Sequence, residues 1–193
     1  MPAARRSIDD AVPPAGEVIQ IRLVELKQLF NAIDPAPFRE KDLDPKAEEF
    51  IVGWARELPA GVPLTLVVRL DRASVPDEAG MLHDAVSQYF GMRSQVTGRR
   101  LRQLFRVGRT SLLIGLLFLA LSFALGEVIE STLEGRFGAL LREGLLIGGW
   151  VAMWRPLEIF LYDWWPIRSE RKLYDRLSAM PVRIAYADTA ATR

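Results

Sequence analysis

The chain has 193 residues, of which 50% are hydrophobic and 25% charged, and its formal net charge is +1. This composition excludes a disordered chain and indicates a packed core, with some apolar surface in contact with lipid. Because cysteine is absent and His83 is the only histidine, disulfide scaffolds, iron–sulfur clusters, cysteine nucleophiles and zinc sites with several imidazoles are excluded.

The small net charge conceals a division between two halves of the chain. From Met1 to Met92 there are 10 Lys and Arg against 15 Asp and Glu, whereas from Arg93 to Arg193 there are 15 against 9. An acidic first half suits a soluble domain. A basic second half suits nucleic acid or a membrane surface, and the hydropathy pattern favours the membrane.

The N-terminal part predicts a small cytosolic α/β domain. Residues 1–16 are polar and rich in Pro and Ala, which predicts a mobile tail, and 17–109 form the domain with its basic juxtamembrane helix. Apolar residues alternate over 17–24 and predict a strand, followed by a helical turn over 25–31 and a proline-rich loop over 34–43. A second strand is predicted over 64–70.

The helix between these strands has a clear start. Asp44 followed by Pro45 predicts its first residues, because aspartate caps free amides and proline fits the first helical position. The helix is expected to end before Pro59. It is expected to place three apolar side chains inward: Phe50, Ile51 and Trp54.

A long helix is predicted to start near Pro76, with Asp77 and Glu78 in its first turn, and to continue into an apolar segment. Thr110–Gly126 contains no charged residue over 17 positions, which is close to the roughly 20 helical residues that a bilayer core requires. We therefore expect a first transmembrane helix over 110–130.

The second apolar segment completes a predicted two-helix transmembrane hairpin. A short extracytoplasmic loop is expected over 131–143 and a second transmembrane helix over 144–167, although Arg155, Glu158 and Asp163 interrupt its apolar character. Residues 168–193 are expected to be cytosolic, with a helix and then a short strand over 181–187 that joins the N-terminal sheet. The hairpin would then be an insertion in the α/β domain.

Positive charge at the ends of these segments predicts the orientation. Six arginines and no acidic residue occupy 93–109, and four basic residues follow the second segment, whereas the connecting segment has only Arg136 and Arg142 beside four glutamates. Both termini are therefore expected in the cytoplasm, at the bacterial inner membrane. The first segment is expected to act as the insertion signal, because no apolar core follows the arginines at the start of the chain.

The juxtamembrane arginines are expected to bind anionic lipid headgroups rather than nucleic acid, because aliphatic and small residues, not stacking aromatics, lie between them. The residues assigned to headgroup binding are Arg99, Arg100, Arg102, Arg106 and Arg109.

The segment Trp150–Ile167 is the most distinctive part of the sequence. Its Trp and Tyr residues are of the types enriched where headgroups meet hydrocarbon, and we interpret them as an interfacial belt: Trp150, Trp154, Tyr162, Trp164 and Trp165. Together with DPAPFREKDLD in the first half, this segment resembles small uncharacterised bacterial inner-membrane proteins with a tryptophan-rich second transmembrane segment. The resemblance implies membrane placement and carries no assigned activity.

Arg155 and Glu158 are three residues apart, so they share a helical face and are expected to form an intramembrane ion pair. Pro156 is expected to kink the helix and to free the carbonyl of Ala152.

Small residues predict where helices approach closely. They recur at every fourth position in both segments: Ser122 and Gly126, and Gly144, Gly148 and Ala152. This pattern suits packing within the hairpin or between subunits, and the sequence favours neither.

The sequence contains no phosphate-binding loop, catalytic triad order or paired-acid motif, so no enzyme activity, cofactor or metal is expected. His83 is interpreted as an ordinary helix residue. A loop cluster of carboxylates (Asp34, Glu40, Asp42 and Asp44) offers cation ligands, but a solvated loop with a helix cap is the favoured interpretation.

The function expected from these features is a non-enzymatic inner-membrane scaffold, assembly factor or accessory subunit. It would be oligomeric or part of a membrane complex and would present its cytosolic domain to a partner. The alternative is a small oligomeric channel or transporter component with a polar path near Arg155 and Glu158.

Overall fold

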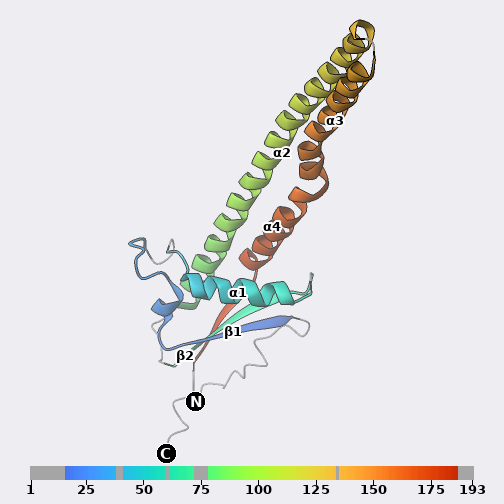
Figure 1. Cartoon of the computed structure of the whole chain (residues 1–193). Coiled ribbons are helices and arrows are strands. Elements are labelled where there is room, and N and C mark those ends of the chain that lie inside the picture. The colour runs from blue at the N-terminus through green and yellow to red at the C-terminus, as the bar shows by residue number, and fades with distance from the viewer. Residues whose placement is uncertain (1–15, 38–40, 60, 72–77, 134, 187–193) are drawn as a thin grey trace, which may run out of the picture. The chain divides into compact units, whose positions relative to one another are not determined.

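A computed structural model describes residues 16–37, 41–59, 61–71, 78–133 and 135–186 (Figure 1). The described part is mostly helical, with two long apolar helices and a small sheet of three parallel strands. The chain divides into two compact units. The first comprises residues 1–95 and 170–193, and the second comprises 96–169, which is inserted in the sequence of the first.

The first unit has the predicted strands and helices. Both N-terminal strands form where expected, and the helical turn after the first strand is a 3-10 helix. In chain order its elements are β1 (Glu17–Leu23), η2 (Leu26–Leu29), α1 (Pro45–Glu57), β2 (Leu64–Leu70), α2 (Glu78–Thr132) as far as Gln95, α4 (Trp164–Ser178) from Glu170, and β3 (Val182–Tyr186).

The predicted start of α1 is confirmed, because the Asp44 side chain accepts a 2.9 Å hydrogen bond from the Lys46 amide and Pro45 is the first helical residue. Helix α2 is continuous over 55 residues, as its sequence predicted. The predicted residues of its first turn, Pro76 and Asp77, lie outside the described residues, as do Glu40 and the predicted tail except Gly16.

The sheet has the order β1-β2-β3, and every pairing is parallel. Ile19 lies opposite Leu66, and Leu66 lies opposite Val182 on the other side. The predicted third strand therefore joins the N-terminal sheet. Parallel neighbours require long crossovers, and here the second crossover contains the whole of the second unit.

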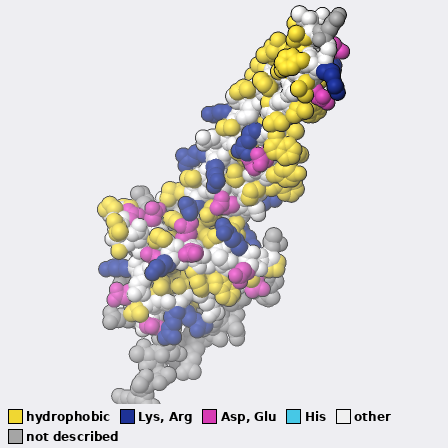
Figure 2. Space-filling model, viewed as in Figure 1, with side chains coloured by type: hydrophobic (Ala, Val, Ile, Leu, Met, Phe, Trp, Pro, Cys, Tyr) yellow, Lys and Arg dark blue, Asp and Glu magenta, His cyan; other side chains and the backbone are white. Residues whose placement is uncertain are grey.

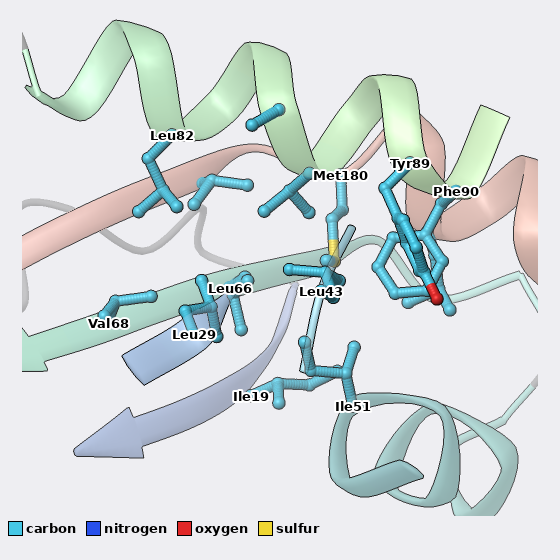
Figure 3. Packing of buried hydrophobic residues seen from close by; sticks show 14 of the residues in the cluster. Ile19, Leu29, Leu43, Ile51, Leu66, Val68, Leu82, Tyr89, Phe90 and Met180 are labelled. Carbon is cyan, nitrogen blue, oxygen red and sulfur yellow. The ribbon is translucent and has the colours of Figure 1, made fainter. Parts of the chain in front are cut away.

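One face of the sheet forms the core with α1 and the first-unit parts of α2 and α4 (Figure 3). Alternate residues of β2 point into it, including Leu66 and Val68, as the period of two in a strand requires. From α2, Leu82 and Phe90 belong to the same core cluster and are fully buried, and Phe90 stacks on Tyr174 of α4. This hydrophobic contact fixes the helices on the sheet.

The inward face of α1 differs from the prediction. Ile51 is buried as expected, together with Val52 and Ala55, but Phe50 and Trp54 are 43% and 47% exposed. A helix buries one stripe of its surface, and Phe50 and Trp54, four residues apart, lie in the adjacent stripe. The prediction that Phe50 and Trp54 face the core is therefore wrong.

The second unit is a helical hairpin. It contains α2 from Val96, α3 (Arg136–Glu158), the π-helical turn η3 (Ile159–Asp163) and the start of α4. Helix α3 begins at Arg136 rather than at Gly144, so the connection between the helices is shorter than the predicted loop 131–143. A 3.1 Å ion pair between Arg142 and Glu130 joins the two helices in this region, and the positive φ of Gly135 suits the tight turn.

Candidate functional site

Two helical segments, Ala79–Thr132 and Arg136–Ser178, are long and apolar enough to cross a membrane. In the most apolar 18 residues of each, only 17% of the residues are buried within the chain. A core helix of a soluble protein would be mostly buried. Figure 2 shows hydrophobic side chains spread over the visible face of the hairpin. The exposed large hydrophobic residues of these helices include leucines, isoleucines and tryptophans.

The two helices of the hairpin meet through small residues on α2. A Cβ atom at Gly108 would lie 2.8 Å from Ile159, and one at Gly115 would lie 3.1 Å from the carbonyl oxygen of Ala152. Ser122 is 1% exposed beside Gly149. Gly108, Gly115 and Ser122 are seven residues apart, which is the spacing of a continuous contact seam between helices.

Some of the predicted small residues lie on this contact seam and others do not. Ser122, Gly126 and Ala152 lie on the contact face, and a Cβ at Gly126 would lie 3.3 Å from Arg142. Gly144 and Gly148 lie off it, with no atom within 4 Å of a Cβ built on either. The four-residue pattern of small residues does not include the contact glycines Gly108, Gly115 and Gly149, although the seven-residue spacing on α2 is a readable signal.

The charged residues of the second apolar segment form one cluster. The guanidinium of Arg155 lies 2.8 Å from the Glu158 carboxylate and 3.3 Å from the Asp163 carboxylate. All three side chains are partly exposed on the outside of the hairpin, with Arg155 the most exposed at 59%. Among the described residues, Arg155 is the one cation paired with these two carboxylates, so the formal charge of the cluster is −1 when all three groups are ionised.

The π-helical turn η3 explains why Asp163 belongs to this cluster. In a regular α-helix, residues eight apart lie about 80° apart around the axis. A π-turn inserts one residue, so that Asp163 occupies the place of a residue seven positions from Arg155, only about 20° away. Pro156 precedes this turn and lacks an N–H, so the Ala152 carbonyl has no α-helical donor.

A shallow groove of about 350 Å³ lies beside the cluster. Ser111 and Arg155 line one part of it, and Ile114 and Phe118 line another. The antiparallel contacts Gly108–Ile159 and Gly115–Ala152 place Ser111 near Arg155 and Phe118 further along the helices. The groove therefore has a polar end and an apolar end.

The residues of the predicted aromatic belt are spread along the helices. Trp150 and Trp165 are 15 residues apart, which corresponds to about 22 Å along a helix at 1.5 Å per residue. Trp154 and Tyr162 are about 70% exposed, whereas Trp164 packs against Phe105 at 6.4 Å between ring centroids. Tyr162, Trp164 and Trp165 lie within one helical turn of one another, whereas Trp150 and Trp154 lie two or more turns away along the chain.

The side chains assigned to headgroup binding are all exposed on α2: Arg99, Arg100, Arg102, Arg106 and Arg109. Within the part of the chain that the structure describes, none forms an ion pair with a carboxylate. Their charge is thus available to an external anion.

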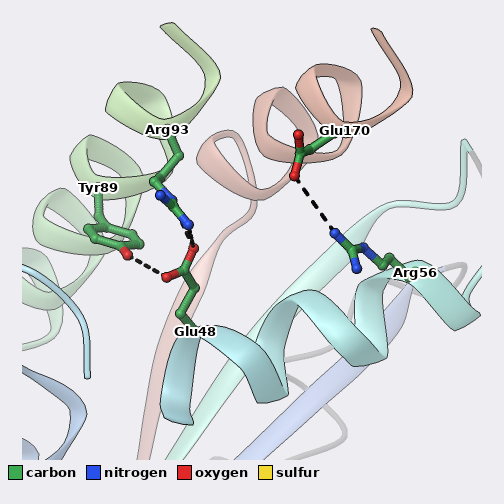
Figure 4. A network of polar contacts seen from close by, with 5 residues as sticks. All are labelled: Glu48, Arg56, Tyr89, Arg93 and Glu170. Atoms are coloured by element: carbon green, nitrogen blue, oxygen red, sulfur yellow. Dashed lines mark hydrogen bonds and ion pairs between the residues drawn. The ribbon is translucent and has the colours of Figure 1, made fainter. Parts of the chain in front are cut away.

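In the first unit, polar contacts join α1 to α2 and to α4 (Figure 4). The Glu48 carboxylate accepts a 2.7 Å hydrogen bond from the Tyr89 hydroxyl and a 2.8 Å hydrogen bond from Nε of Arg93, and Arg56 lies 3.9 Å from Glu170. Burial and the bond to Glu48 raise the pKa of Tyr89. Burial alone would lower the pKa of Arg93, but the hydrogen bond and charge of Glu48 raise it above its usual value.

In the acidic loop, the carboxylates of Asp34 and Asp44 accept hydrogen bonds from backbone amides. The Asp34 carboxylate accepts hydrogen bonds from the amides of Asp42 and Ala36, at 2.8 and 2.9 Å, and these bonds lower its pKa. Asp44 is the helix cap, and His83 is partly buried on α2. Among the described residues, no group of three His, Asp or Glu side chains is arranged to hold a metal ion.

Comparison of the chain with protein-family models, with curated proteins and with solved structures found no match. The function proposed below therefore depends on geometry and chemistry alone.

Proposed function

We propose that the chain is a bacterial inner-membrane protein that acts without catalysis, as a scaffold, assembly factor or accessory subunit. Its hairpin crosses the bilayer twice and its α/β unit binds a partner in the cytoplasm. The observation that carries the proposal is the exposed apolar surface of α2 and α3: Ile114, Leu117 and Val151 are each more than 60% exposed. Water would penalise this surface, whereas hydrocarbon would not.

The sheet supports an even number of membrane crossings. Because β2 and β3 are neighbours in one sheet, the chain that leaves after β2 returns to the same side before β3. Two crossings satisfy this requirement. The exposed arginines of α2 and the basic residues after Trp165 then favour the cytoplasm for both ends of the hairpin.

The aromatic pair of α1 is the surface that we propose for the partner. Phe50 and Trp54 are both nearly half exposed, and their ring centroids are 6.2 Å apart. Exposed aromatic side chains of this kind are enriched among residues that contribute most to protein–protein binding. Neither residue is needed to fill the core, which Ile51 and Ala55 complete from the same helix.

Single cysteines test the membrane topology, since the chain has none. Glu49 and Ser131 are exposed positions on α1 and near the end of α2. An impermeant thiol reagent applied to intact spheroplasts is expected to label Ser131→Cys but not Glu49→Cys, and both after lysis. Labelling of Glu49→Cys in intact spheroplasts would contradict the orientation, and recovery of the chain in the soluble fraction would contradict the membrane location.

Affinity purification in mild detergent tests the accessory role. The wild-type chain is expected to co-purify with a specific cytoplasmic or membrane partner, and the Phe50→Ala/Trp54→Ala variant is expected to lose that partner. Lys46→Ala, at an exposed position on the same helix, is the control and should retain it. Equal recovery from both variants would contradict the assignment of the aromatic pair.

A channel component is the second candidate function, and the exposure of Arg155 on the outside of the hairpin favours it. Several copies would have to surround a path lined by these side chains. Ion flux through wild-type protein in liposomes, lost in Arg155→Gln without loss of folding, would support this candidate. Absence of flux from folded wild-type protein would contradict it.

A further inference from the structure

The groove beside Arg155 has the shape and polarity of a lipid-binding site. Arg155 and Ser111 line its polar end, and Ile114 and Phe118 line its apolar end. Gly115 forms part of its wall without a side chain, so an acyl chain can approach the backbone. A phospholipid has the same sequence of chemical groups, from headgroup to hydrocarbon.

The charges around the polar end select one kind of headgroup. Arg155 supplies donors in the geometry that suits a phosphate, whereas Glu158 and Asp163 beside it supply two carboxylates. A headgroup with one phosphate and one primary ammonium group matches both, with the phosphate at Arg155 and the ammonium at the carboxylates. An anionic headgroup offers nothing to the surplus carboxylate, and a trimethylammonium group cannot donate hydrogen bonds to it.

The same charge argument disfavours a second copy of the chain at this surface. Two identical clusters, each with one guanidinium and two carboxylates, would bring surplus negative charge together in a medium of low dielectric constant. A zwitterionic headgroup adds no net charge to the cluster, and its ammonium group gives the second carboxylate a cationic partner.

We propose that this groove binds one molecule of phosphatidylethanolamine, with an acyl chain along Ile114 and Phe118. The proposal rests on the membrane location proposed above and adds a ligand to it. It also assigns a role to the π-helical turn η3, which brings the second carboxylate, that of Asp163, to the headgroup position.

Lipid binding to the full-length protein tests the proposal. The protein is extracted from membranes, delipidated in detergent and mixed with dioleoyl phosphatidylethanolamine, phosphatidylcholine or phosphatidylglycerol, and bound lipid is counted by native mass spectrometry. One molecule of phosphatidylethanolamine is expected to bind about tenfold more tightly than either alternative, a difference of roughly 1.4 kcal/mol. Free phosphoethanolamine should not compete, because it lacks the acyl chain.

Two variants with matched side chains locate the site. Ile114→Trp places an indole in the groove, whereas Leu113→Trp places the same group at a position that does not line it. Both positions are about 60% exposed, so neither substitution enters a packed core. Ile114→Trp is expected to weaken phosphatidylethanolamine binding about tenfold, and Leu113→Trp to leave it unchanged. Asp163→Asn is expected to reduce the preference over phosphatidylcholine.

The outcomes separate this proposal from the membrane proposal. If the chain is not recovered from membranes, the proposed location fails. If it is recovered from membranes and folded, but binds the three lipids equally, the lipid site is wrong and the location stands. Equal binding by Ile114→Trp and Leu113→Trp would likewise overturn the site, because the lipid would then lie elsewhere.

Discussion

The hydroxyl of Tyr89 on α2 donates a 2.7 Å hydrogen bond to the carboxylate of Glu48 on α1. Arg93, one turn further along α2, donates to the other oxygen of the same carboxylate and lies over the Tyr174 ring at 5.6 Å. These contacts connect α1 to α2 close to Gln95, the last residue of the first unit before the hairpin.

Loss of the Tyr89 hydroxyl is expected to destabilise the protein. Tyr89→Phe removes one hydrogen bond to a charged group and should lower the free energy of unfolding by about 1.5–3 kcal/mol. Urea unfolding of the first unit in detergent, followed by near-ultraviolet circular dichroism, measures it. Tyr186→Phe, at a side chain that is 48% exposed, is the control and should have little effect.

Stability is expected to fall at alkaline pH because of the same residue. Burial and the hydrogen bond to Glu48 raise the pKa of Tyr89 in the folded chain, whereas the pKa of this tyrosine in the unfolded chain is about 10. Its contribution is therefore complete below about pH 10 and is lost as the pH rises toward the folded value, since the unfolded chain releases its proton first. Burial also raises the pKa of Tyr174.

The measurement is the free energy of unfolding at several pH values from about 9 to 11.5, a range that brackets the unfolded pKa. The wild-type protein should lose stability more steeply than Tyr89→Phe, which retains only the contribution of Tyr174 and other groups. Identical slopes in the two proteins would show that Tyr89 does not cause the alkaline loss.

Two neighbouring residues of α1 are expected to behave very differently when truncated. Ile51 is fully buried, so Ile51→Ala should cost about 2–5 kcal/mol through lost burial and the cavity that remains. Trp54 is 47% exposed, so Trp54→Ala should cost less than about 1 kcal/mol, well below the usual cost for a buried aromatic residue. Comparable losses would mean that Trp54 is part of the core.

The charge cluster of the hairpin predicts an asymmetric pattern of losses. Arg155→Leu leaves two carboxylates without a cation and should cause the largest loss of thermal stability in this set of variants. Glu158→Leu should cost less, because Asp163 still pairs with Arg155. The double variant Arg155→Leu/Glu158→Leu should be more stable than Arg155→Leu alone.

Thermal unfolding of the detergent-solubilised protein measures this pattern. Strictly additive losses in the double variant would show that Arg155 and Glu158 do not interact. The pair Arg142–Glu130, at the other end of the hairpin, is the comparison. Its side chains are 45% and 65% exposed, so its removal should cost less than about 1 kcal/mol.

The small residues of α3 offer a matched pair. Gly149→Leu must displace Leu119, which would lie 2.8 Å from a new Cβ, and the neighbouring Ser122. We expect it to cost about 1–3 kcal/mol through overpacking. Gly148→Leu meets no atom within 4 Å and should leave the hairpin stable. A lower oligomer mass for Gly148→Leu at unchanged stability would place Gly148 between subunits, the alternative to packing within the hairpin.

Local sequence patterns predicted most of the helices and strands of this protein. Interleaved apolar and polar residues predicted β1 and β3, the run LTLVVRL predicted β2, and Asp44 with Pro45 predicted the start of α1, because these signals act between residues close in the chain. The length of the uncharged stretch from Thr110 likewise indicated a membrane-spanning helix, since hydropathy sums over a local segment. The Arg155–Glu158 pair was predictable because three residues separate its members on one helix.

Local patterns did not predict which apolar residues are covered or which charges meet across the fold. Phe50, Ile51 and Trp54 are similar in hydropathy, and the width of the contact that α1 makes with the core selects Ile51 alone. Gly149 rather than Gly148 packs on α2, because a difference of one residue turns a helix by about 100°. Asp163 joins Arg155 through a π-turn that no local pattern announced, and Glu48 meets Tyr89 across 41 residues of chain. Each of these relationships depends on packing between distant segments, which local periodicity does not contain.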